Sequence, residues 1–268
     1  MSRFLLDAVR SRSLRNVAIA ASVLLFATAC SVLRSPTTPM AFVVDRAPAA
    51  DSDGAPARCL LVLLPGTGDS TADLVEHGMV RMVRERRIAA DVLIADAHFG
   101  YYRSRTAVQR IWEDVLAPRI ANYDEVWLAG VSLGGFGALL CASDIEVAEH
   151  ADVTGVLAVA PYLGGNGVAD AVLAAGGLRS WQPPASEPKV GERVFAWLRG
   201  YADPATKRPR MFVGIGREDG LERQVRAAAT VLPASQVVEV AGGHDWPAFL
   251  AIWNELLDRA PLPRRPVR

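Results

Sequence analysis

The sequence predicts an α/β protein with a mostly parallel, doubly wound sheet and flanking helices. Three observations lead to this class: short β-rich apolar runs recur along the chain, helical patterns fill the gaps, and the runs are apolar almost throughout. Parallel strands covered by helices on both faces have this continuous apolar character. Strands that alternate with helices are joined by right-handed crossovers. The 268 residues are enough for one large domain of this kind.

The elements follow one another in a regular order. Strands are expected at 59–64, 91–95, 125–129, 154–160, 211–215 and 236–240, with an edge strand at 41–44. Helices are expected at 73–87, 106–120, 133–148, 221–231 and 246–258. One interval, about 162–209, breaks the alternation just before the penultimate strand. We interpret it as an insertion, and insertions of this length are usually functional or mobile.

The first thirty residues differ in kind from the rest. Arginines precede an apolar run at 17–29, and Cys30 follows that run. This pattern is typical of a secretory signal, and the run is shorter than the roughly 20 apolar residues of a membrane-spanning helix. The segment also resembles a bacterial lipobox in which Cys30 is lipidated, although Ala27 stands where leucine is usual. A lipoprotein, a cleaved signal and an uncleaved anchor remain open, and each places the domain in the bacterial cell envelope, on the periplasmic face or outside.

The rest of the chain divides into three parts. Residues 31–57 are expected to form a tether, 58–260 the folded domain with its insertion, and 261–268 a solvated tail. Lysine plus arginine equals aspartate plus glutamate, with 29 residues each. This balance argues against nucleic acid as a partner. Cys59 and Cys141 lack metal-ligand spacing, and their apolar neighbours favour two buried thiols over a disulfide.

The strongest chemical motif lies at residues 130–134, which read Gly-Val-Ser-Leu-Gly between a predicted strand and a predicted helix. This is the strand–turn–helix context in which G-x-S-x-G presents a serine nucleophile. The flanking glycines allow close backbone packing around a strained apex. Ser132 is therefore the candidate nucleophile, and the helix N-terminus that follows adds partial positive charge.

A serine nucleophile needs a base, and a histidine base needs a carboxylate. Of the four histidines, His77 and His150 are expected at the surface, whereas His244 follows the last strand and is the candidate base. Asp219 follows the penultimate strand and is the candidate acid, with Glu218 as its competitor. The neighbouring Asp245 is expected to cap the last helix instead.

An acyl-transfer site also needs donors for a developing oxyanion. The amide of Leu133 is one candidate. The second is expected from the glycine-rich loop after the first central strand, where Thr67 and Gly68 are the candidates. This loop lacks the spacing and the lysine of a phosphate-binding loop.

These motifs resemble the α/β-hydrolase superfamily, and within it small bacterial esterases of the esterase D and enterochelin-esterase groups. The resemblance is carried by residues 130–139 and by the histidine loop at 242–247, and it spans roughly 60–257. It implies a serine hydrolase that cleaves a carboxylic ester through an acyl-enzyme, without cofactor or metal. Esterases of these groups usually have more sheet before the oxyanion loop than the run at 41–44 supplies.

The substrate remains open at this level. A lipid, an acylated glycan or a small-molecule ester would each fit, and a thioesterase, a peptidase or an acyltransferase would use the same triad. A non-catalytic binding lipoprotein on the same fold is the alternative of a different class. His98 and Tyr102 follow a predicted strand, so we expect them to line a substrate pocket with the insertion, although an aromatic packing cluster fits equally well.

Overall fold

A seven-stranded sheet forms the centre of the domain. The computed structural model describes residues 34–48, 56–185 and 188–266. The strands lie in the order β1-β3-β2-β4-β5-β6-β7, with β1 antiparallel to β3 and every other pair parallel. Their bounds are β1 (Phe42–Asp45), β2 (Cys59–Leu64), β3 (Ala90–Ala95), β4 (Glu125–Val131), β5 (Val153–Val159), β6 (Arg210–Gly216) and β7 (Val237–Val240). The predicted α/β class is confirmed.

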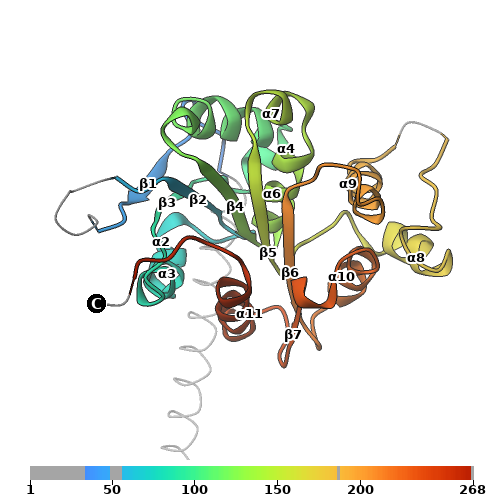
Figure 1. Ribbon diagram of the computed structural model, residues 1–268. Coiled ribbons are helices and arrows are strands. Elements are labelled where there is room, and N and C mark those ends of the chain that lie inside the picture. Colours follow the sequence, from blue (N-terminus) through green and yellow to red (C-terminus); the bar gives the residue numbers. More distant parts are fainter. Residues whose placement is uncertain (1–33, 49–55, 186–187, 267–268) are drawn as a thin grey trace, which may run out of the picture.

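Helices cover both faces of this sheet. Their bounds are α2 (Thr71–Glu76), α3 (Met79–Glu85), α4 (Phe99–Arg103), α5 (Ala107–Arg110), α6 (Leu133–Ser143), α7 (Ile145–His150), α8 (Asn166–Ala174), α9 (Val190–Arg199), α10 (Glu222–Ala229) and α11 (Trp246–Arg259). Shorter turns are a π-helix η1 (Ile111–Leu116) and 3₁₀ segments η2 (Ile120–Asn122), η3 (Gly200–Ala202) and η4 (Ala234–Gln236). In Figure 1, α3 and α11 lie on one face, and α6, α9 and α10 lie on the other. The fold is therefore a three-layer α/β/α arrangement.

Two of the predicted helices are interrupted. The helix expected at 73–87 divides at Gly78, whose φ of 90° lies in the left-handed region that glycine adopts readily. The helix expected at 133–148 divides at Asp144, which is extended, and whose Oδ1 accepts a hydrogen bond from the Val147 amide. In each case a local backbone preference overrides the apolar periodicity.

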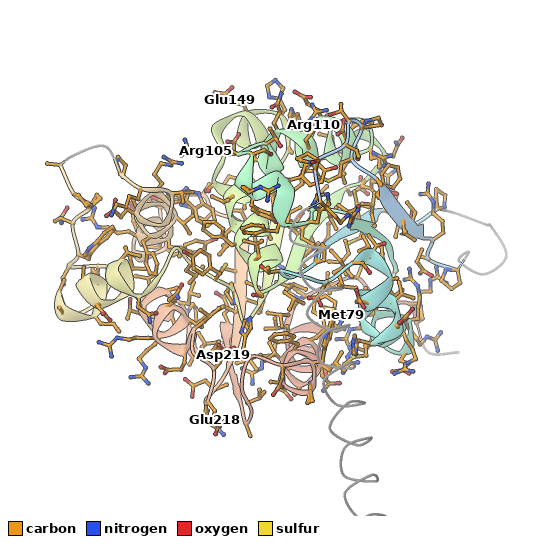
Figure 2. The ribbon with its side chains drawn as sticks, turned by 180° about the vertical axis from the view of Figure 1, so that it is seen from behind. Met79, Arg105, Arg110, Glu149, Glu218 and Asp219 are labelled. Atoms are coloured by element: carbon orange, nitrogen blue, oxygen red, sulfur yellow. The ribbon has the colours of Figure 1, made fainter. Side chains whose placement is uncertain are left out.

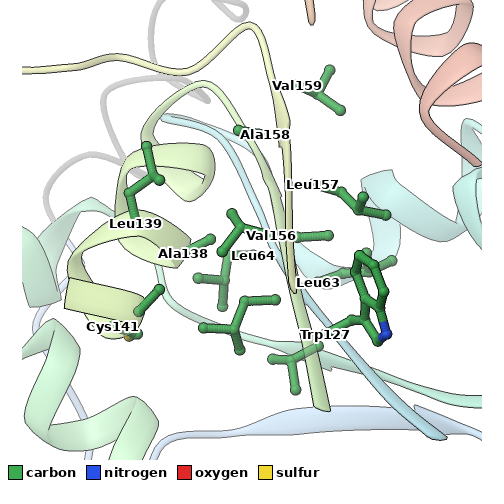
Figure 3. Close-up of a cluster of buried hydrophobic side chains, with 14 of the residues drawn as sticks. Leu63, Leu64, Trp127, Ala138, Leu139, Cys141, Val156, Leu157, Ala158 and Val159 are labelled. Carbon is green, nitrogen blue, oxygen red and sulfur yellow. The ribbon is translucent and has the colours of Figure 1, made fainter. Parts of the chain in front are cut away.

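The core lies on both sides of the central strands. Figure 3 shows Ala138, Leu139 and Cys141 of α6 on one side of the sheet and Trp127 on the other. All four are buried. Because both faces of the strands are covered, their residues are apolar without alternation, as the sequence pattern predicted. The thiols of Cys59 and Cys141 are buried and unpaired, and burial raises the pKa of each.

Residues 34–48, the described part of the expected tether, pack on the domain. Met40 is buried and its amide donates to Asp114 Oδ2 at 2.8 Å. The guanidinium of Arg34 pairs with Asp96, and β1 follows as the edge strand. The folded body therefore includes these residues, whereas Cys30 lies outside the described part.

The insertion before β6 is held to the domain at its base. Gln224 on α10 is buried, and its Oε1 accepts hydrogen bonds from the amides of Leu163 at 2.8 Å and Gly165 at 3.2 Å. Its Nε2 donates to Asn166 Oδ1 at 3.2 Å. One side chain thus satisfies two amides at the start of the insertion, so this part is anchored to α10.

Replacing Gln224 with leucine is expected to lower the free energy of unfolding by about 2–4 kcal/mol, because two amides lose their acceptor. Urea unfolding followed by circular dichroism measures the change. The same substitution at Gln109, whose side chain forms an exposed hydrogen bond with Glu113, is expected to change stability by less than about 0.5 kcal/mol. Equal effects at the two positions would contradict the anchoring role.

Candidate active site

Ser132 lies at the sharp turn between β4 and α6. Its φ of 52° and ψ of −113° are strained for a residue with a side chain. A Cβ at Gly130 would lie 2.2 Å from the Gly134 carbonyl carbon, and a Cβ at Gly134 would lie 2.1 Å from Leu64 O. Both flanking positions therefore require glycine, and the turn presents the serine side chain above the sheet edge.

His244 and Asp219 reach this serine from two neighbouring loops. His244 Nε2 lies 2.8 Å from Ser132 Oγ, and His244 Nδ1 lies 2.6 Å from Asp219 Oδ2. The second oxygen, Asp219 Oδ1, accepts a hydrogen bond from the Leu221 amide at 2.8 Å. The Asp219 side chain has no exposed surface, whereas 36% of the His244 side chain is exposed. The three residues thus form a continuous hydrogen-bonded chain that begins at the protein surface.

Glu218 points elsewhere, although it neighbours Asp219 in sequence. Its Oε2 accepts a hydrogen bond from the Gly242 amide at 2.5 Å, and its own amide donates to Gly242 O at 3.1 Å. Figure 2 shows both carboxylates at one end of the molecule, with Glu218 further out. Glu218 therefore holds the histidine loop to the loop after β6, while Asp219 contacts the imidazole.

Asp245 caps the last helix, as predicted. Its Oδ1 accepts a hydrogen bond from the Ala248 amide at 3.0 Å, which satisfies one of the unpaired amides at the start of α11. The cap sets the beginning of α11 two residues after His244.

One expected oxyanion donor, Leu133, directly follows the serine, and the turn that contains the other two adjoins the serine at Gly66. Leu133 is the first residue of α6, and within the described residues its amide has no hydrogen-bond acceptor. Across from it, a Cβ at Gly66 would lie 3.6 Å from Ser132 Cβ. The Asp69 amide donates to Gly66 O at 3.3 Å, and Gly68 has a φ of 91°, which is the geometry of a type II turn. Thr67 and Gly68 are the central residues of this turn, and their donor role stays a prediction.

His98 directly precedes α4 and Tyr102 lies within it, and within the described chain no hydrogen bond or ring contact joins either residue to Ser132, His244 or Asp219. His98 is buried; its Nδ1 accepts a hydrogen bond from the Gly100 amide at 3.2 Å, and burial lowers its pKa. The hydroxyl of Tyr102 is buried against Gly137 and, within the described residues, has no hydrogen-bond partner. Their part in a substrate pocket stays a prediction.

Replacing Tyr102 with phenylalanine is expected to raise the free energy of unfolding by about 1 kcal/mol, because a buried hydroxyl without a partner is removed. A Cβ at Gly137 would lie 2.1 Å from Tyr102 Oη, so Gly137→Ala is expected to destabilise the wild type more than the Tyr102→Phe variant. Urea unfolding of the four proteins measures this coupling. Additive effects would contradict the coupling. If Tyr102→Phe also left the relative rates on a panel of esters unchanged, Tyr102 would not line the substrate pocket.

Sequence reasoning missed several contacts of the serine turn and of the histidine loop. The amide of Tyr162 donates to Ser132 O at 3.1 Å, and its ring packs edge-on against Phe136. His77, which was expected only to lie at the surface, stacks on Trp246 with ring centroids 3.9 Å apart. Trp246 is two residues from His244 in the sequence, and this neighbourhood was the signal that could have indicated a ring contact near the histidine loop. Within residues 34–48, 56–185 and 188–266, no cluster of three or more metal-ligating side chains occurs.

The likeness of this chain to known proteins lies in its structure. No family model matches the sequence, and no curated protein matches it. Solved structures do match. An S-formylglutathione hydrolase from Staphylococcus aureus is 14% identical, with a TM-score of 0.53 over 84% of this chain and 99% of its own. This chain has the α/β-hydrolase fold.

Two further structures share the α/β-hydrolase fold. FphF, a fluorophosphonate-binding serine hydrolase of Staphylococcus aureus, is 16% identical, with a TM-score of 0.52 over 82% of this chain and 98% of its own. Est1E from Butyrivibrio proteoclasticus is 14% identical, with a TM-score of 0.52 over 82% and 94%. In this α/β-hydrolase fold, β1 is the single described strand before β2, which agrees with the short apolar run noted in the sequence.

Proposed function

We propose that this protein is a serine hydrolase that cleaves a carboxylic ester, with Ser132 as nucleophile, His244 as base and Asp219 as acid. The observation that carries the proposal is the hydrogen-bonded chain from Asp219 Oδ2 through His244 to Ser132 Oγ. The α/β-hydrolase fold, shared with solved hydrolases, supports it.

The geometry accounts for each proton transfer. With its proton on Nδ1, His244 donates to Asp219 and leaves Nε2 to accept the Ser132 proton. Ser132 Oγ attacks the acyl carbon, and the leaving alkoxide takes the proton back from Nε2. Water then attacks the acyl-enzyme with the same histidine as base, so that the acid is released and Ser132 Oγ is reprotonated. The amide of Leu133 and an amide of the 66–69 turn stabilise the oxyanion in both halves.

Fluorophosphonate labelling of the protein lacking residues 1–30 tests the proposal. We expect one modified residue, Ser132, identified by mass spectrometry, together with turnover of a short-chain chromogenic ester. No labelling and no turnover by the folded protein would contradict it. Hydrolysis of thioesters or amides in preference to esters would instead assign the same triad to the alternative substrate classes.

We further propose that the domain acts in the bacterial cell envelope, on a lipid, glycan or small-molecule ester, and is held to a membrane through Cys30 or an uncleaved helix. The basic and apolar pattern of residues 1–30 supports this, and those residues lie outside the described structure. Within the described residues, none of the helices has the length and apolar character to cross a bilayer. Mass spectrometry of the mature N-terminal peptide, compared with a Cys30→Ser variant, separates lipidation from simple cleavage.

A further inference from the structure

Asp69 closes the turn that contains the expected oxyanion donors. Its carboxylate Oδ2 lies 2.6 Å from the position that a Cβ of Gly66 would occupy, and Ser132 Cβ lies 3.6 Å from the same position. The Asp69 amide donates to Gly66 O at 3.3 Å, and the Gly66 amide lowers the pKa of the Asp69 carboxylate. Gly66 is thus held by Asp69 on one side and adjoins the nucleophile on the other.

The same carboxylate reaches the histidine loop. The side chain of Trp246, the first residue of α11, lies close enough to this carboxylate to lower its pKa. Phe249, one turn later, packs edge-on against Trp246 and His244, with ring centroids 5.8 Å and 4.9 Å away. His77 stacks on the indole, with ring centroids 3.9 Å apart. A chain of contacts therefore runs from the 66–69 turn through Asp69 and Trp246 to the ring of His244.

We propose that Asp69 is a positioning residue that fixes the 66–69 turn and the histidine loop relative to each other around Ser132. This inference rests on the proposed function. In this role Asp69, a residue outside the triad, aligns the oxyanion donors with the base. Misplacement of such groups by about 1 Å can cost on the order of 100-fold in rate.

The charge of Asp69 makes the inference testable. Burial and the neighbouring Asp73 raise the pKa of Asp69, and the Gly66 amide, His77 and Trp246 lower it by smaller amounts. The carboxylate interacts with the Gly66 amide and with Trp246 most strongly when it is ionised, so its hold is strongest above its pKa and weakens as pH falls through it. Asparagine at this position keeps an acceptor oxygen without the charge, whereas alanine removes the acceptor.

The experiment compares Asp69→Ala, Asp69→Asn and Asp73→Ala with the wild type, through kcat and KM for p-nitrophenyl acetate and the rate of fluorophosphonate labelling. We expect Asp69→Ala to lower kcat and the labelling rate about 10- to 100-fold, with KM changed less. Asp69→Asn is expected to stay within about 3-fold of wild type, with the Asp69 ionisation absent from its pH profile. Asp73, whose carboxylate caps α2 through Ser70, is the matched control: its variant loses thermal stability but keeps kcat.

Two results would overturn the inference. Asp69→Ala with wild-type kcat would show that the turn holds its place without the carboxylate. Asp69→Asn falling as far as Asp69→Ala would show that the charge, and not the acceptor geometry, matters. If the wild-type protein neither turned over esters nor became labelled, the proposed function itself would fail as well. That result differs from the two above, in which the wild type is active.

Discussion

Replacing His244 with alanine is expected to lower kcat for ester cleavage on the order of a million-fold, the loss seen when a serine hydrolase loses its base. The reason is local: Nε2 of this ring is the proton acceptor 2.8 Å from Ser132 Oγ, and a serine hydroxyl is a weak nucleophile without one. Stopped-flow or long-time assays with a chromogenic ester measure the change, and fluorophosphonate labelling should fall with it.

The control for this variant is His150→Ala. His150 is the last residue of α7, at the end of the molecule where Figure 2 shows Glu149, away from Asp219. Its replacement is expected to leave kcat within about 2-fold, as for a surface position. If His244→Ala retained more than about one per cent of wild-type kcat with an unchanged thermal midpoint, the imidazole would not be the base.

Replacing Asp219 with asparagine is expected to lower kcat about 10⁴-fold, because an amide in this place favours the wrong tautomer of the histidine. Asp219 Oδ2 is 2.6 Å from His244 Nδ1, and its carboxylate has no exposed surface. An asparagine that donates to Nδ1 would place the imidazole proton on Nε2. In that tautomer Nε2 cannot accept the serine proton. Measurement of kcat for the purified variant tests this.

Glu218→Gln provides the matched control one residue away. Its side chain contacts the Gly242 amide rather than the imidazole, and glutamine keeps an acceptor oxygen for that amide. We expect kcat to fall less than about 10-fold, through slightly looser seating of the histidine loop. A larger loss in Glu218→Gln than in Asp219→Asn would reverse the assignment and make Glu218 the acid.

Much of the fold could be predicted because its signals are local. Continuous apolar runs identified the parallel strands, and G-x-S-x-G between a strand and a helix identified the turn at Ser132. The interruptions at Gly78 and Asp144 were missed because the apolar periodicity continues across them. At Gly78 the backbone turns left-handed, and at Asp144 a carboxylate competes for helix amides.

The candidate site was also predictable in part from local signals. Ser132, Asp219 and His244 follow three different strands of a parallel sheet, whose carboxyl ends meet at one edge, so their proximity was expected and the structure contains it. The choice between Asp219 and Glu218 was left open in sequence because adjacent side chains leave a loop in different directions. Their catalytic roles, and those of Leu133, Thr67 and Gly68, stay predictions until the variants are assayed.

By itself, the sequence determined the α/β class, the positions of the strands and the candidate nucleophile, base and acid, because these depend on backbone rules that act over a few residues. The pairing of Asp219 with His244, the anchoring of the insertion by Gln224 and the link from Asp69 to Trp246 depend on the tertiary structure. Each joins segments far apart in the chain, and such contacts form only when packing of the core brings the loops of the sheet edge together.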